Sequence, residues 1–74
     1  MSGLPILNTK DLIRVLKKIG FQEMRQKGSH RFFMHSDGRT TLVSIHSNED
    51  IGRGLLRQIL REIEITPDEF MKLL

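Results

Sequence analysis

The sequence predicts a small α+β domain with the element order α-β-β-β-α-α, in which helices pack on one face of a three-stranded antiparallel sheet. Apolar residues recur with helical period near both ends of the chain. Between these segments, β-branched and aromatic residues are separated by glycine-containing turns, which is typical of hairpins. Because 74 residues leave room for one hydrophobic core, we expect a single domain over 1–74.

The first helix is expected over 10–19. Asn8 and Thr9 offer polar side chains that cap a helix N-terminus, and Gly20 suits the position that follows a C-terminus. The apolar residues on one helix face are Leu12, Ile13, Val15, Leu16 and Ile19. Residues 1–7 are expected to form an extended segment ahead of this helix.

Three strands should follow, over 21–26, 29–36 and 39–46. Lys27-Gly28 is a weak signal for the first hairpin turn, and Asp37-Gly38 is a strong signal for the second. Asp-Gly favours a two-residue type I′ turn, because both central residues of that turn need a positive φ.

A two-residue turn at 37–38 would fix the pairing so that His30 faces Ile45. The side chains that would share a face with His30 are Phe32, Met34, Val43 and Ile45. Because that face is apolar, we expect the helices to cover it and His30 to lie at the rim of the core, where partial burial favours a neutral imidazole. His46 would point to the other face unless a β-bulge precedes it, and bulges are common beside active sites.

A second helix is expected to begin near 52–54, and a short third helix after Thr66. Its start combines a threonine cap, Pro67 at the first helical position and Glu69 completing a capping box. The apolar residues that recur with helical period in these two segments are Leu55, Leu56, Ile59, Leu60, Ile63, Phe70, Leu73 and Leu74.

Positive charge is concentrated in the first part of the chain. Residues 1–46 contain eight Lys and Arg against three Asp and Glu, whereas residues 47–74 contain four against six. A basic region suits a polyanionic partner such as nucleic acid. The chain has no cysteine, which excludes disulfides and thiolate metal sites. No segment is typical of a membrane span or a secretory signal, so we expect a cytoplasmic protein with no membrane partner.

Several motifs, in this order and spacing, point to a known family. They are Gly20-Phe21, Arg25-Gln26-Lys27-Gly28-Ser29-His30, His46, Gly54-Leu55-Leu56-Arg57-Gln58-Ile59-Leu60-Arg61 and Asp68-Glu69-Phe70. Over residues 8–74 the chain resembles the HicA family, toxins of bacterial and archaeal toxin–antitoxin pairs. The resemblance implies a double-stranded-RNA-binding-domain-like fold, endoribonuclease activity on mRNA, and inhibition by a HicB-type antitoxin. Because the family commonly has glycine at the position of Glu64, the second helix is expected to run on or to end without a left-handed cap.

The resemblance also implies that His30 is the catalytic residue, because it occupies the position of the family's histidine. RNA carries its own nucleophile, the 2′-hydroxyl, so cleavage needs a base, an acid and positive groups near the phosphate, but no cofactor. Histidine suits the acid and base roles because it titrates near neutral pH. The residues expected to bind RNA are Lys27, Gly28, Ser29 and Arg31. His46 is expected to transfer the second proton or to orient the neighbouring loop.

No metal site is expected. His30 and His35 are an odd number of residues apart on one strand, so they face opposite sides, and His35 should be solvated. No carboxylate cluster completes a coordination shell.

Two further functions remain open: a non-catalytic RNA-binding module of the same fold, and an inactive toxin kept as a partner-binding scaffold. Four Phe with no Trp or Tyr predict no base-stacking platform, and therefore weak sequence preference.

Overall fold

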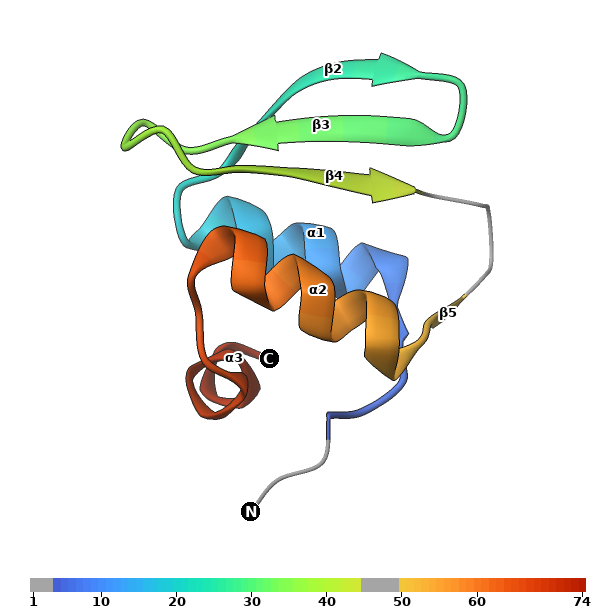
Figure 1. The fold of residues 1–74 in the computed structure, drawn as a ribbon, viewed down its shortest axis with the longest axis vertical. Coiled ribbons are helices and arrows are strands. Elements are labelled where there is room, and N and C mark those ends of the chain that lie inside the picture. Colours follow the sequence, from blue (N-terminus) through green and yellow to red (C-terminus); the bar gives the residue numbers. More distant parts are fainter. Residues whose placement is uncertain (1–3, 45–49) are drawn as a thin grey trace.

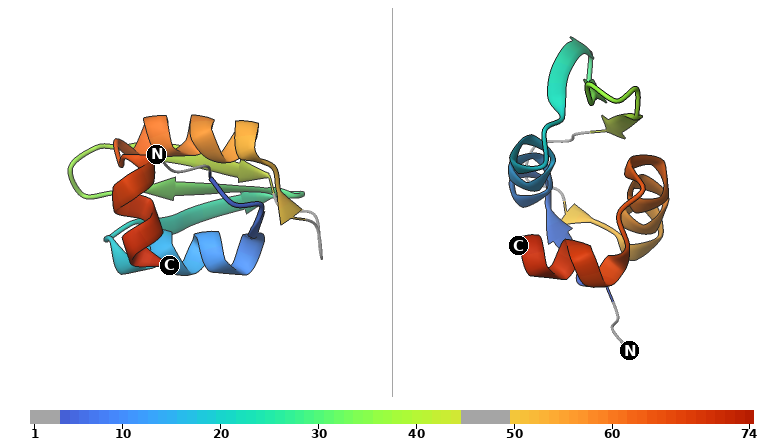
Figure 2. Two further views of the ribbon diagram at one scale, coloured as in Figure 1. Left: turned by 90° about the horizontal axis from the view of Figure 1, so that it is seen from below. Right: turned by 90° about the vertical axis from the view of Figure 1, so that its left-hand side faces the viewer.

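The structure is a computed structural model that describes residues 4–44 and 50–74. In chain order the elements are β1 (Leu7–Asn8), α1 (Thr9–Lys18), β2 (Gln22–Lys27), β3 (His30–Met34), β4 (Thr40–Ser44), β5 (Asp50–Ile51), α2 (Arg53–Ile63) and α3 (Pro67–Leu73). The sheet has the strand order β2-β3-β4, and α1 and α2 lie along one of its faces (Figure 1). On the side of these helices away from the sheet, α3 crosses them (Figure 2). The predicted α+β architecture is therefore confirmed.

The helix boundaries follow from local capping. The Asn8 side chain accepts a hydrogen bond of 2.7 Å from the Lys10 N–H, and this fixes the start of α1. The predicted capping box of α3 is present, because the Thr66 hydroxyl accepts from the Glu69 N–H and the Glu69 carboxylate accepts from the Thr66 N–H. The expectation for the end of α2 was wrong, since Glu64 itself adopts the left-handed conformation with φ 60°.

Residues 4–8, ahead of α1, are part of the folded domain. Leu4 and Leu7 are buried, and β1 pairs with β5 in a small antiparallel sheet. The Arg53 side chain at the start of α2 donates a hydrogen bond of 2.6 Å to the Leu4 carbonyl. None of the helices in the described ranges is long and apolar enough to span a lipid bilayer.

The core lies between the helices and one face of the three-stranded sheet. Its buried apolar residues are Leu4, Leu7, Leu12, Val15, Leu16, Phe21, Phe33, Val43, Ile51, Leu56, Ile59, Leu60, Ile63 and Phe70. The strands β3 and β4 contribute only Phe33 and Val43 to this set, together with the buried polar residue Thr41. The Thr41 hydroxyl donates a 2.7 Å hydrogen bond to the Glu62 carboxylate of α2.

The turn between β3 and β4 has three residues rather than the two expected. His35 and Arg39 close it through a 2.8 Å N–H to carbonyl bond, and the Gly38 N–H bonds back to the His35 carbonyl. Gly38 has φ 100°, whereas Asp37 does not have a positive φ. This is the pattern of a type I turn followed by a left-handed residue, the usual three-residue hairpin loop, and not of a type I′ turn.

The extra loop residue shifts the β3–β4 pairing by one position. Phe32 pairs with Leu42, and His30 pairs with Ser44 instead of Ile45. A shift by one residue exchanges the two faces of a strand, because side chains alternate. The prediction that His30 shares a face with Phe32 and Met34 follows from that alternation and holds. The prediction that the helices cover this face was wrong, because the helices instead cover the face of Phe33.

The other side of the sheet, called the open face below, points away from the helices. No other element among residues 4–44 and 50–74 covers it (Figure 2). Its exposed large apolar side chains are Met24, Met34 and Leu42, with Phe32 partly exposed between them. An uncovered apolar face beside charged residues is typical of an interaction surface.

Candidate functional site

The open face contains a hollow of about 420 Å³ near the β2–β3 turn. The residues that line the hollow are Arg25, Lys27, His30, Phe32 and Leu42. Arg25 and Lys27 come from β2, His30 and Phe32 from β3, and Leu42 from β4. Because no carboxylate of the described residues lines the hollow, its charge is positive and suits an anionic ligand.

His30 is the first residue of β3 and lies in this hollow. Its side chain is exposed, and no hydrogen bond joins its imidazole to another residue within 4–44 or 50–74. The expected position at the rim of the core was wrong, because the longer turn places His30 on the side of the sheet opposite the helices. The imidazole is therefore accessible from solvent.

The turn beside His30 consists of Gly28 and Ser29. Gly28 has φ 59°, a conformation that glycine adopts without strain and that type II′ hairpin turns place at this position. The Gln26 side-chain amide donates a hydrogen bond of 3.1 Å to the Gly28 carbonyl. Lys27 and His30 are direct cross-strand partners on either side of this turn. The structure thus brings three of the four predicted RNA-binding residues next to His30.

Arg31, the fourth predicted RNA-binding residue, does not join the hollow. It pairs with Val43 on the helix-facing side of the sheet, opposite to the side of His30. Its guanidinium lies 3.6 Å from the carboxylate of Glu23. Arg31 therefore places its charge behind the sheet rather than on the open face.

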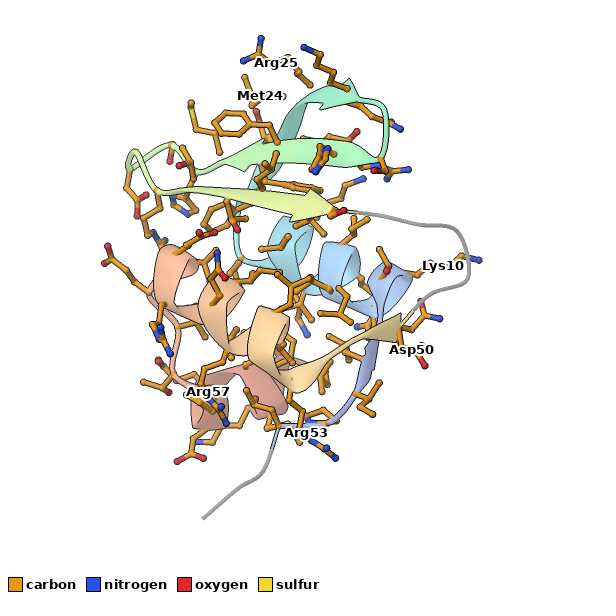
Figure 3. The ribbon with its side chains drawn as sticks, turned by 45° about the vertical axis from the view of Figure 1, so that its right-hand side comes forward. Lys10, Met24, Arg25, Asp50, Arg53 and Arg57 are labelled. Carbon is orange, nitrogen blue, oxygen red and sulfur yellow. The ribbon has the colours of Figure 1, made fainter. Side chains whose placement is uncertain are left out.

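Arg25 is the basic residue that sequence reasoning missed. A β-bulge interrupts β2 between Glu23 and Arg25, and beyond it the two-residue spacing of Arg25 and Lys27 puts both on the open face. Figure 3 shows Arg25 and Met24 projecting from β2 away from the helices. The alternation of Arg25 and Lys27 was the available signal in the sequence.

His46 and Ile45 lie outside the described residues, so the role of His46 as a second proton-transfer or orienting group stays a prediction. Within the described residues, the ionisable groups that line the hollow are His30, Arg25 and Lys27.

His35 has a structural position, and the expectation that it is solvated was wrong. Only 19% of its side chain is exposed. Its Nε2 lies 3.1 Å from the Ile19 carbonyl, and its Nδ1 accepts a 3.1 Å hydrogen bond from the Asp37 N–H. The same Nδ1 also lies 3.1 Å from the Asp37 carboxylate. The ring also makes an edge-on contact with Phe21 at 5.1 Å. His35 therefore joins the β3–β4 loop to the end of α1.

Arg39 holds the other side of the same loop. Its backbone N–H and its Nε donate to the Asp37 carboxylate at 3.0 and 2.7 Å. The backbone bond is the largest of the effects that lower the pKa of Asp37 below its ordinary value. Arg39 also donates to the Ile63 carbonyl at the end of α2. The loop that sets the β3–β4 register is thus fixed to α2.

No three histidine or acidic side chains come together in a group that could hold a metal ion, among the residues that the structure describes. Among residues 4–44 and 50–74, those that line the hollow supply one imidazole, two cationic side chains and an apolar floor formed by Phe32 and Leu42.

Residues 9–65 match the family model described as HicA toxin of bacterial toxin-antitoxin. The matched range contains α1, the whole three-stranded sheet and α2, and so every residue that lines the hollow. It leaves out the segment of Leu4 and Leu7, and also α3. The search of curated proteins gave no match.

Proposed function

Because the chain belongs to the HicA toxin family of bacterial toxin–antitoxin systems, we propose that it is a metal-independent endoribonuclease that cleaves mRNA with His30 as its catalytic residue. Membership of this family makes the chain a toxin and implies an antitoxin partner. The observation that supports the activity is the hollow, where an exposed imidazole lies beside two cationic side chains. Its place of action is then the cytoplasm, where mRNA is present.

In the proposed reaction, the RNA 2′-hydroxyl attacks the adjacent phosphorus and the bond to the 5′-oxygen breaks. His30 takes the proton of the 2′-hydroxyl as general base, and a general acid protonates the leaving 5′-oxygen. The products are a 2′,3′-cyclic phosphate and a 5′-hydroxyl. Lys27 and Arg25 stabilise the negative charge that builds up on the phosphate, and the Gly28-Ser29 turn positions the RNA backbone. His46 is the proposed second group, as proton donor or as orienting residue.

The test is cleavage of a long RNA by the purified chain in excess chelator, compared with the His30→Ala variant. We expect cleavage by the wild type and a loss of about 100-fold or more in the variant, the usual size of a general acid–base contribution. Arg57→Ala is the control for loss of a basic side chain, because Arg57 projects from α2 away from the open face (Figure 3). Equal cleavage by His30→Ala would contradict the assignment. Binding of RNA without cleavage by the wild type would instead identify a non-catalytic RNA-binding module.

We also propose that the antitoxin is of the HicB type and inhibits the toxin by covering the open face. Met24 and Met34 are exposed there beside the hollow, and burial of such side chains drives protein association. A partner on this face would cover His30 as well. Met34→Glu should therefore weaken inhibition by the co-expressed antitoxin while RNA cleavage by the free toxin is retained. Unchanged inhibition would place the antitoxin elsewhere on the molecule.

A further inference from the structure

We propose that the hollow beside His30 binds one unpaired base of the RNA against Phe32 and Leu42, so that the substrate is single-stranded RNA. This inference rests on the proposed endoribonuclease function and names the substrate class of the same site. It differs from what the fold alone suggests, because double-stranded-RNA-binding domains read the shape of a duplex.

The two ends of the hollow differ in chemistry. Phe32 and Leu42 are direct cross-strand partners and form an apolar floor, although 51% of Leu42 is exposed. Arg25, Lys27 and His30 provide the polar and cationic rim. A nucleotide has the matching two-part character, with a flat base that stacks on apolar or aromatic surface and an anionic phosphate that binds cations.

The position of Phe32 suits base stacking. It lies two residues after His30 on the same side of β3, so its ring and the imidazole line one hollow. Aromatic side chains on an uncovered sheet face stack unpaired bases in other RNA-binding modules. The chain has only four Phe and no Trp or Tyr, yet the structure leaves this one accessible beside the proposed catalytic residue.

The reaction also favours an unpaired nucleotide. Attack by the 2′-oxygen needs that oxygen in line with the phosphorus and the leaving 5′-oxygen, a geometry that a regular base-paired helix does not provide. A base held against Phe32 is taken out of its helix stack, and the phosphate beside it is then free to rotate. Binding of one base against Phe32 therefore helps to align the 2′-hydroxyl for attack on the phosphate beside that base.

The experiment uses a DNA strand that carries one ribonucleotide, so that cleavage can occur at a single phosphate. The toxin is tested on this strand alone and on the strand annealed to its complement. It is also tested on two single strands that lack one base, either on the 5′ or on the 3′ side of the scissile phosphate. We expect the single strand to be cut at least ten times faster than the duplex. Removal of one of the two bases should slow the wild type by about 5- to 150-fold, the range that corresponds to stacking of one base on an aromatic ring.

The Phe32→Ala variant should show a similar loss on the intact strand and little further loss when the base is removed, because the two changes remove one contact. Phe32→Trp should retain cleavage, since it keeps a stacking surface. Met34→Ala is the matched control, because Met34 lies on the same strand and face but does not line the hollow. A urea unfolding curve of each variant shows that it is folded.

Binding of an all-DNA strand, which cannot be cut, separates failure of this inference from failure of the proposed activity. If no strand is cut, the nuclease proposal fails. The base site is still supported if the wild type binds the single strand more tightly than the duplex and Phe32→Ala removes this preference. The inference is overturned if duplex is cut or bound as well as single strand, or if base removal has no effect. It is also overturned if Phe32→Ala weakens only antitoxin binding, because the hollow would then be a protein-docking surface.

Discussion

Two adjacent phenylalanines on opposite faces of β3 test which face of the sheet the helices cover. Phe33 is fully buried against the helices, whereas Phe32 lies on the open face. Replacement of a buried phenylalanine by alanine costs about 3–5 kcal/mol of unfolding free energy, from lost burial and from the cavity left behind. Phe32 is partly exposed, so its replacement loses less burial and leaves no enclosed cavity. We therefore expect Phe33→Ala to be more destabilising than Phe32→Ala by about 2 kcal/mol.

The difference is large for a domain of this size. At the typical 0.05–0.15 kcal/mol per residue, 74 residues give a stability of about 4–11 kcal/mol. Phe33→Ala should then remove about a quarter of the stability or more, and Phe32→Ala should leave a cooperative transition with a higher urea midpoint than that of Phe33→Ala. Urea unfolding followed by far-ultraviolet circular dichroism measures both. If Phe32→Ala were the more damaging variant, the core would lie on the His30 side of the sheet and the assignment of the open face would be wrong.

Three further outcomes follow from the structure. Glu64→Gly should raise the unfolding free energy by about 1 kcal/mol, because the left-handed conformation at this position strains a residue with a side chain; a lower midpoint in urea would contradict the φ of 60°. The hydrogen bond from the Thr66 backbone is the largest effect that lowers the pKa of Glu69 below its ordinary value of 4.5. The ionised Glu69 side chain therefore contributes fully to stability above that value, and this contribution is lost as pH falls through the lower pKa of the folded state. Glu69→Gln keeps the capping geometry without a charge, and unfolding curves between neutral and acidic pH should depend less on pH for this variant than for the wild type. Lys27→Ala should slow RNA cleavage and reduce the salt dependence of RNA binding, whereas Arg31→Ala should change neither in a variant that is shown to be folded; equal losses would place both side chains at the RNA.

Much of the fold could be predicted because its signals are local. The caps at Asn8 and Thr66, the glycine after α1 and the helical spacing of apolar residues depend on neighbours within a few positions. The alternation of side chains along β3 is equally local, so the grouping of His30 with Phe32 and Met34 was correct.

Local sequence signals could not predict which face of the sheet the helices cover. The covered face depends on whether the turn after His35 contains two residues or three, and Asp-Gly is compatible with both. Both candidate faces also contain large apolar residues, since Phe32 and Phe33 are neighbours in the chain. The preference for three residues involves contacts with distant positions, through His35 to Ile19 and Arg39 to Ile63.

The candidate site was predictable in part for the same reasons. The Gly28-Ser29 turn and its neighbours Lys27 and His30 form a continuous stretch, so their proximity is local. The contribution of Arg25 had a local signal in its alternation with Lys27, whereas the contribution of Leu42 requires the pairing of β3 with β4.

The one-sided sheet has a consequence for the genetics of this toxin. In β3 and β4, the open-face residues have even numbers and the helix-facing residues have odd numbers. When cells that survive expression of the toxin are selected, changes at odd positions such as 33 and 43 should yield survivors with little folded protein. Changes at even positions such as 30 and 32 should yield survivors in which the protein accumulates in its native form. Survivors with little toxin should therefore carry mutations at odd-numbered positions of β3 and β4, and survivors with abundant toxin should carry mutations at even-numbered positions.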